Sequence, residues 1–241
     1  MATETMEFHR RDLLSAAAAA LGGALGLGRT TAQAAIAPPP DAAPRLVSGA
    51  RLDGVDGGAL WSIAGLSDFA LPGRVHAVAA LDKGRVMMVG RRPGPFAAIL
   101  DPEGNAAAAL VAPAAGHRFV GHAAANPERL VTTELHEETA EGIAVTCDPH
   151  TGEGRAAWPL SGIEPHDLVF TRSGARLVVA LGGIAHSVGI KSPPINAGHI
   201  DSAILELDAR SGRVLERHAL PRDMASLSLR HLALAPDGET V

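Results

Sequence analysis

The sequence contains no tyrosine, two tryptophans and five phenylalanines, so aromatic residues make up only 3% of the chain. Proteins that bind single-stranded nucleic acid stack its bases on aromatic side chains, and proteins that bind the phosphate backbone carry a basic patch. The formal net charge of −5 provides no excess of positive charge. The composition therefore argues against a nucleic-acid partner.

Cysteine is also nearly absent, because Cys147 is the only one in the chain. An intramolecular disulfide and a zinc or iron–sulfur site built from several cysteines are thus excluded. We expect Cys147 itself to be a small buried hydrophobic residue in a strand. The sequence also lacks His-Glu-x-x-His, a phosphate-binding Gly-Lys-Ser/Thr and the Gly-x-Ser-x-Gly nucleophile elbow.

What the chain does have is the composition of a globular β protein. Apolar residues are 46% and charged residues 20% of the chain, which is not the balance of a disordered protein. The 27 glycines and 17 prolines indicate many turns rather than a few long helices. This composition favours an all-β fold.

Residues 1–34 are predicted to be a twin-arginine signal peptide. The arginine pair is followed at short distance by large apolar residues, which is the twin-arginine pattern. An apolar stretch over residues 13–27 is shorter than the roughly 20 residues that a membrane span needs. Small residues then precede a predicted cleavage before Ala35. The residues that carry this prediction are Arg10, Arg11, Leu13, Leu14, Ala32 and Ala34.

The signal peptide predicts export to the periplasm, with no membrane span left after its removal. The alternative is an Ala-rich amphipathic helix that belongs to the fold. Residues 35–45, which include Pro38-Pro39-Pro40, are expected to form a stiff Pro/Ala-rich linker. The remaining residues, 46–241, are assigned to the folded domain.

One pattern recurs along this domain. Each copy starts with a histidine in an apolar strand, continues through a turn and a second strand, and ends with a third strand that closes on Asp-x-x-(x)-Gly. The copies begin at His76, His122, His166 and His231. A further strand follows the closing glycine, so each unit of about 45 residues supplies the four strands of a β-propeller blade.

The third copy is longer, because residues 182–200 are inserted between its second and third strands. About four blades are begun in the chain, whereas a propeller needs a closed ring of blades. We therefore expect this chain to be part of a longer propeller of six to eight blades, most plausibly seven.

Short motifs occur in order along the domain, at residues 90–94, 116–122, 133–134, 162–167, 182–184 and 227–233. Together they resemble the DUF1513 family, which consists of exported bacterial proteins of the YVTN/WD40-like propeller class that includes quinoprotein amine dehydrogenase heavy chains. The resemblance covers nearly the whole mature chain and implies the same fold and a twin-arginine signal.

The resemblance implies no settled activity, although family members are often encoded beside imelysin-type and iron-uptake genes. The segment after Gly183 departs from the family, which usually has Thr-His-Pro and Lys-Leu-Asn runs there. This chain instead has Ile184-Ala185-His186-Ser187 and Ile190-Lys191-Ser192-Pro193-Pro194.

The four repeated histidines occupy equivalent blade positions, near the start of the innermost strand, where side chains are expected to point into the axial funnel. A ring of neutral imidazoles there could bind a metal or a haem edge. The alternative is structural, because a histidine at this position can hydrogen-bond the backbone of the next blade and fix the blade angle. The metal and the cofactor stay unknown at this stage.

Glu134 is a further candidate ligand, in a run of carboxylates and an imidazole over residues 134–138. We expect this run to form a loop at the mouth of the propeller, where oxygen ligands could bind a hard cation. The alternative is a solvated acidic loop. His117 and the run His199-Ile200-Asp201 are weaker polar candidates.

Two functions fit these features. The first is a periplasmic propeller that binds or scaffolds an unknown protein or small-molecule ligand, linked to iron or redox handling. The second is an oxidoreductase or hydrolase with a histidine-lined metal or cofactor site at the funnel mouth. The fold alone does not decide between them, because propellers host both.

Overall fold

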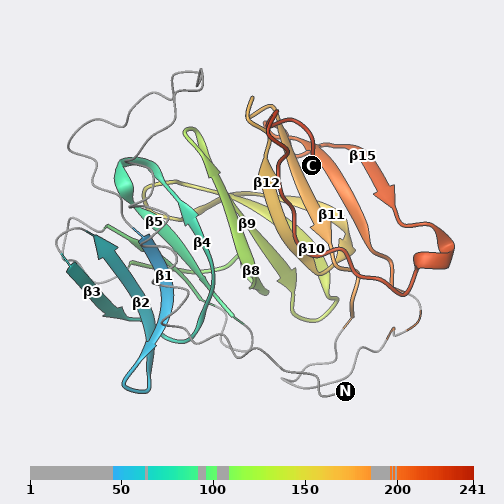
Figure 1. The fold of residues 1–241 in the computed structure, drawn as a ribbon. Coiled ribbons are helices and arrows are strands. Elements are labelled where there is room, and N and C mark those ends of the chain that lie inside the picture. The colour runs from blue at the N-terminus through green and yellow to red at the C-terminus, as the bar shows by residue number, and fades with distance from the viewer. Residues whose placement is uncertain are drawn as a thin grey trace, which may run out of the picture. The chain divides into compact units, whose positions relative to one another are not determined.

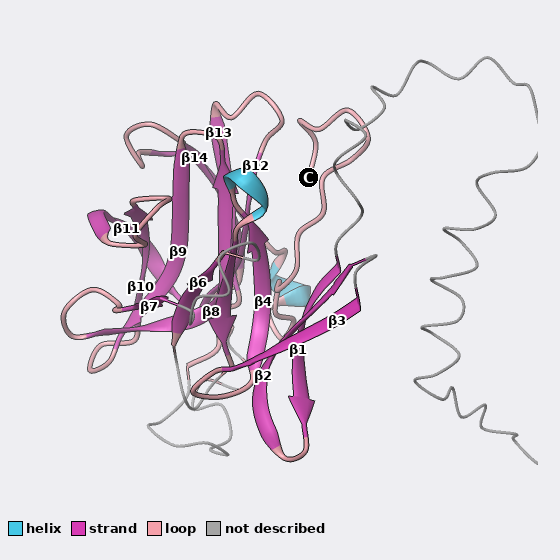
Figure 2. Cartoon of the chain, turned by 90° about the vertical axis from the view of Figure 1, so that its left-hand side faces the viewer, coloured by secondary structure: helices cyan, strands magenta, loops and turns pink. Residues whose placement is uncertain are grey.

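The computed structural model describes residues 46–62, 65–91, 96–101, 109–185, 196, 198 and 200–241. The predicted signal peptide, the predicted linker and most of the insertion at 182–200 lie outside the described residues. Regular structure in the described part is almost entirely β-strand (Figures 1 and 2), with two single-turn 3-10 helices at Asp82–Gly84 and Arg222–Met224.

The strands form four antiparallel sheets, each built from consecutive strands of the chain. The first sheet contains β1 (Leu46–Leu52), β2 (Val55–Ser62) and β3 (Gly65–Ala70). The second contains β4 (Val75–Ala80), β5 (Val86–Gly90), β6 (Ala97–Leu100) and β7 (Ala109–Val111). The third contains β8 (His117–Asn126), β9 (Arg129–His136), β10 (Glu141–Cys147) and β11 (Gly154–Ile163). The fourth contains β12 (Pro165–Phe170), β13 (Arg176–Leu181), β14 (Ala203–Asp208) and β15 (Val214–Ala219).

The innermost strands of neighbouring sheets pack against each other. Strand β8 contacts both β4 and β12, and β4 also contacts β1. Sheets of consecutive strands whose first strands meet in this way are the blades of a β-propeller. The predicted all-β propeller fold, with about four blades in this chain, is confirmed.

The hydrophobic core lies between blades rather than within them. One cluster joins Trp158 and Leu160 of the third blade to Leu205 and Leu207 of the fourth. A second cluster joins the second and third blades in the same way. A third cluster lies between the first and second blades. Each blade thus buries its faces only when its neighbours are present.

The Asp-x-x-x-Gly element of the repeat forms a turn that also seals the blade interface. In the fourth blade the Asp208 carboxylate accepts a hydrogen bond from Ser211 N at 2.8 Å, and Gly212 N donates to Asp208 O at 2.9 Å. Gly212 has φ +72°, and a Cβ added to it would lie 2.1 Å from the Trp158 ring of the preceding blade. Gly152 occupies the same place against Val111.

The fourth histidine repeat differs from the expectation of a strand. No strand is assigned to the described segment 225–241, where Leu232 N donates instead to the Asp167 side chain and Ala235 N to Thr240 O. Among the described residues no strand of its own blade pairs with this segment, so it lacks the backbone ladder that defines a strand.

We predict that Gly212→Ala destabilises the domain through its contact with Trp158. Alanine at this position combines a left-handed backbone with overpacking against a buried ring, and overpacking typically costs about 1–3 kcal/mol. Gly54→Ala is the matched control, because Gly54 also has positive φ (+85°) but has no atom within 4 Å of the added Cβ. Urea denaturation should show a larger loss for Gly212→Ala, and equal losses would contradict the packing argument.

Candidate metal centre

The structure brings the four repeated histidines together in one cluster. His76 lies on β4, His122 on β8 and His166 on β12, and His231 lies in the segment that follows the fourth blade. Neighbouring ring centroids are 4.9 Å apart for His76 and His122, and 5.1 Å apart for His122 and His166. The rings of His166 and His231 are also 5.1 Å apart. We call these four residues the axial histidine cluster.

Three of these histidines sit at irregularities of their strand pairs. The β4–β5 register shifts between Val75 and Ala77, and the β12–β13 register shifts between Pro165 and Asp167. The β8–β9 register shifts between Phe119 and Ala123, so His122 lies within the strand and not near its start. A β-bulge re-aims the side chain of its extra residue. The irregularities explain how successive blades can turn a histidine toward the same space.

Gly121 allows the first two histidines to approach. Its φ is +121°, and a Cβ added to it would lie 2.5 Å from Cδ2 of His76. Any larger residue before His122 would therefore displace the His76 ring. Sequence reasoning missed this role, although a glycine directly before a repeated histidine was a visible signal.

The nitrogens of three histidines are close enough to share one ion. His76, His122 and His166 each offer a ring nitrogen, and these three atoms lie within 4.8 Å of one another. Nitrogens bound to one tetrahedral ion at about 2.0–2.1 Å lie roughly 3.4 Å apart, so small side-chain shifts would complete the site. Imidazole suits zinc, copper, iron and nickel.

Two of these rings carry buried nitrogens that the protein does not satisfy. His122 Nε2 and His166 Nδ1 have no hydrogen-bond partner among the described residues. Buried polar atoms nearly always have a partner, and an exception calls for an explanation such as an ion or a water. The donor chemistry of the cluster thus fits a bound cation.

His166 is held in the neutral form that binds metals. Burial, the positive charge of Arg230 and the neighbouring imidazoles together lower its pKa to about 3, and burial is the largest of these causes. Arg230 itself is paired with the side chain of Glu164, which is 2% exposed and has positive φ (+54°). Glu164 also accepts a hydrogen bond from Ile184 N at 3.2 Å.

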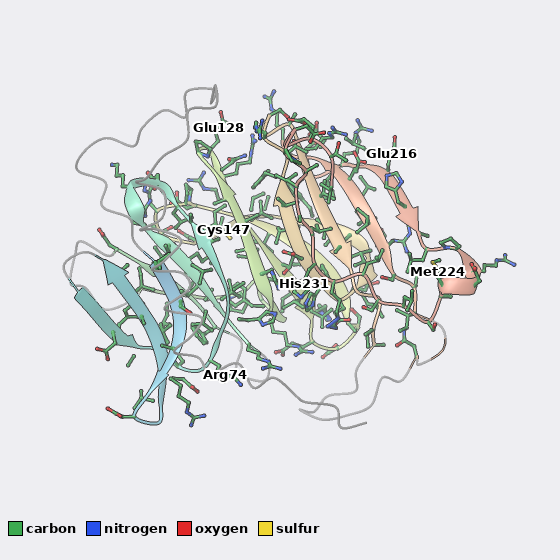
Figure 3. The ribbon with its side chains drawn as sticks, viewed as in Figure 1. Arg74, Glu128, Cys147, Glu216, Met224 and His231 are labelled. Atoms are coloured by element: carbon green, nitrogen blue, oxygen red, sulfur yellow. The ribbon has the colours of Figure 1, made fainter. Side chains whose placement is uncertain are left out.

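His231 is the most open member of the cluster. Its side chain is 69% exposed, and its Nδ1 lies 3.8 Å from Oδ2 of Asp167. Figure 3 shows His231 near the middle of the described domain, whereas Glu216 lies on β15 at its outer edge. His231 could therefore add a fourth imidazole from the solvent side.

Glu134 does not lie in a loop, which corrects the sequence prediction. Strand β9 continues to His136 because its partner β10 pairs with it as far as Gly142, and Glu134 is 1% exposed. Its carboxylate accepts hydrogen bonds from Ala114 N at 2.8 Å and from the Thr132 hydroxyl at 3.0 Å. Glu134 thus fixes local backbone, and only residues 137–140 form the turn.

Glu134 also lines a cavity of about 490 Å³ between β7 and the strands β10 and β11. The wall includes Cys147, a buried strand residue as expected, and burial raises the pKa of its thiol to about 11. A protonated thiol is a poor nucleophile and metal ligand. The cavity and the axial histidine cluster are lined by different residues.

Among the described residues, the weaker polar candidates His117 and Asp201 form no cluster with the axial histidines. His117 packs its ring edge-on against His136 at a centroid distance of 5.0 Å. Asp201 is exposed and pairs with Arg217 at 2.8 Å, and His199 lies outside the described residues. A second group lies on β14 and β15, where Glu206 is half-buried and Glu216 and His218 are exposed.

We predict that Glu134→Gln stabilises the domain at neutral pH. Burial raises the pKa of Glu134, so its charged form is disfavoured in the folded state, and the folded state gains relative stability as the carboxyl is protonated at lower pH. Glutamine keeps the shape without the charge: its amide oxygen can accept from Ala114 N, and its amide nitrogen can donate to the Thr132 hydroxyl, which both donates and accepts.

The measurement is thermal unfolding of both proteins from pH 7 to pH 4. The variant should melt higher at pH 7, and the difference should shrink as pH falls through the titration of Glu134. Glu137→Gln, on an exposed carboxylate of the adjacent turn, should leave the curve unchanged. A variant that is less stable than the parent at pH 7 would contradict the desolvation argument.

The sequence profile described as "Protein of unknown function (DUF1513)" matches residues 69–241. This match covers well over half of the chain, so the chain belongs to the DUF1513 family. The resemblance drawn from the motifs is confirmed. No match was found among curated proteins.

Solved structures similar to this chain are β-propellers. Hydrazine synthase of Kuenenia stuttgartiensis matches with a TM-score of 0.57 and 15% identity, over 76% of this chain and 47% of the other. The Dos1 propeller matches with a TM-score of 0.50 and 10% identity, over 69% and 44%. The chain thus spans about half the length of these structures, and the likeness concerns the fold.

No helix in the described part of the chain combines the length and the apolar character that crossing a membrane requires.

Proposed function

We propose that this chain is an exported propeller module that binds one first-row transition-metal ion in its axial histidine cluster. The observation that carries the proposal is the convergence of three imidazoles from three successive blades, with ring nitrogens within 4.8 Å of one another. Neutral imidazole is the commonest metal ligand among side chains.

The structural alternative for the histidines accounts less well for their surroundings. A histidine that only fixes the blade angle would hydrogen-bond the backbone of the neighbouring blade. His122 Nε2 and His166 Nδ1 are buried and make no such bond within the described residues. Leaving a buried polar atom unsatisfied costs about 1–3 kcal/mol, which an ion would recover.

The donor set selects the class of cation. Nitrogen ligands suit Fe²⁺, Co²⁺, Ni²⁺, Cu²⁺ and Zn²⁺, whereas Mg²⁺ and Ca²⁺ prefer oxygen. An iron-linked or redox-linked role agrees with this class, and the iron-uptake genes often found beside family members favour Fe²⁺ among these ions. The proposed ligands are His76, His122 and His166, with His231 available as a fourth.

A catalytic metal centre is the second candidate function. Three imidazole ligands leave at least one coordination position for water or substrate, which is the arrangement of catalytic rather than structural zinc sites. His76 is exposed, so that position would be open to solvent. An oxidoreductase or hydrolase would then act at the mouth of the propeller.

We predict that the mature protein binds one Zn²⁺ or Co²⁺ per chain and that His122→Ala and His166→Ala each weaken binding by about 100-fold. Each substitution removes one of three ligands, and the remaining two cannot hold the ion tightly. Isothermal titration of the metal-free protein gives the stoichiometry and the affinity. Absorption of the Co²⁺ form reports nitrogen ligation directly.

The matched control is His218→Ala, which removes a histidine from the exposed group on β14 and β15. It should leave Zn²⁺ affinity unchanged, and excess Mg²⁺ should not compete. If His218→Ala abolishes binding while His122→Ala does not, the ion binds at the outer edge and the proposal is wrong. Absence of stoichiometric binding would equally contradict it.

We further propose that the chain reaches the periplasm by the twin-arginine route. We predict that replacing Arg10 and Arg11 together by lysine retains the precursor inside the cell, because this route recognises the arginine pair and not positive charge alone. Cell fractionation measures the distribution. Arg29→Lys, in the same predicted signal but outside the pair, should be exported normally, and export of the double variant would contradict the proposal.

A further inference from the structure

We infer that Asp167 is the positioning residue of the axial histidine cluster. Its carboxylate holds His122 in the tautomer whose Nε2 lone pair is available to an ion. This inference rests on the proposed metal-binding function, because it names the residue that prepares one of the ligands. It does not require the ion to be iron or the site to be catalytic.

The contact between Asp167 and His122 decides the tautomer. Oδ1 of Asp167 lies 3.0 Å from Nδ1 of His122. Each carboxylate oxygen of Asp167 also accepts a backbone N–H, Oδ1 from Leu168 and Oδ2 from Leu232, so both oxygens act as acceptors. An ionised carboxylate only accepts hydrogen bonds, so Nδ1 must carry the proton.

A neutral imidazole protonated at Nδ1 has its lone pair on Nε2. This is the atom of His122 that is buried without a partner among the described residues. A carboxylate behind a ligating imidazole fixes the ring orientation and increases the basicity of the ligand nitrogen. Asp167, His122 and the proposed ion would form this arrangement.

The carboxylate is itself fixed on both oxygens. Leu168 N donates to Oδ1 at 2.8 Å, and Leu232 N donates to Oδ2 at 3.0 Å. The Asp167 side chain therefore cannot rotate without losing one of these bonds. It also links three parts of the propeller, because it lies on β12, accepts the hydrogen bond of His122 from β8, and accepts a hydrogen bond from the backbone beside His231.

His231 and His166 do not have this support to the same degree. His231 Nδ1 is 3.8 Å from Oδ2, which is too long for a hydrogen bond. His166 Nδ1 has no hydrogen-bond partner in the described part of the chain, so no such contact selects its tautomer. Asp167 therefore acts specifically on His122, and His166 serves as an internal reference in the same protein.

Asp167→Asn is the discriminating substitution, because it keeps the shape and removes the charge. An amide has only one oxygen, whereas the two donors contact different oxygens of the carboxylate. Leu232 N donates to Oδ2, and His122 Nδ1 donates to Oδ1. If the oxygen stays with Leu232, the amide nitrogen faces His122 and drives the proton to Nε2. If the oxygen faces His122, it also keeps the bond from Leu168 N and the tautomer is retained, while two N–H groups oppose each other at Leu232. Asp167→Ala is therefore the companion variant, because it offers His122 no acceptor in any orientation.

The experiment measures both tautomer and metal affinity in the full-length mature protein. Long-range ¹H–¹⁵N spectra of the metal-free protein should show His122 protonated at Nδ1, and in Asp167→Asn the population should move toward the Nε2-protonated form while His166 is unchanged. Titration with Zn²⁺ should show affinity reduced by about 10–100-fold.

Asp208→Asn is the control, because Asp208 lies in the same blade and accepts backbone amides but no imidazole. It should lower stability without changing the His122 tautomer or Zn²⁺ affinity. A parent protein with His122 protonated at Nε2 would overturn the inference, even if no variant folds. So would an Asp167→Ala variant with unchanged tautomer. A parent protein with the expected tautomer but no Zn²⁺ binding would instead defeat the metal-binding proposal.

Discussion

The contact of β8 with both β4 and β12 is the constraint on which the candidate site depends. These innermost strands are close enough that side chains turned inward from all three blades share one space. The strand pairs are irregular at His76, His122 and His166, and an irregularity of this kind redirects a side chain. The shared space then accommodates two rings only because Gly121 has no Cβ at the point where His76 approaches.

Because of this packing, the candidate site exists only when the three blades are in contact. Each hydrophobic cluster is shared between neighbouring sheets, and the proposed ligands come one from each of three successive blades. No single blade could hold an ion with one imidazole. Ion binding would therefore be coupled to the packing of the blades, since an ion that joins them stabilises only the state in which they are in contact.

The sequence predicted the repeats and the equivalence of the four histidines because both depend on local chemistry. A turn such as Asp208–Gly212 is encoded by an Asx hydrogen bond and a left-handed glycine within five residues. The burial of Glu134 was not predictable in this way, because it depends on how far β9 pairs with β10. Gly121 and Asp167 act through residues of other blades, so single-sequence reasoning had no direct evidence for their roles.

The polar groups around His166 favour the binding of a metal cation over protonation of the imidazole. Arg230 adds to burial in lowering the pKa of His166, and its own charge is offset by Glu164, so the pair adds little net charge beside the cluster. Imidazoles about 5 Å apart repel one another when protonated, and burial adds to that cost. Each neutral ring has one nitrogen lone pair, and where these lone pairs face the common space only a cation or a donor of hydrogen bonds can satisfy them together. A transition-metal ion can bind three ring nitrogens at once, whereas a single water can donate hydrogen bonds to only two of them.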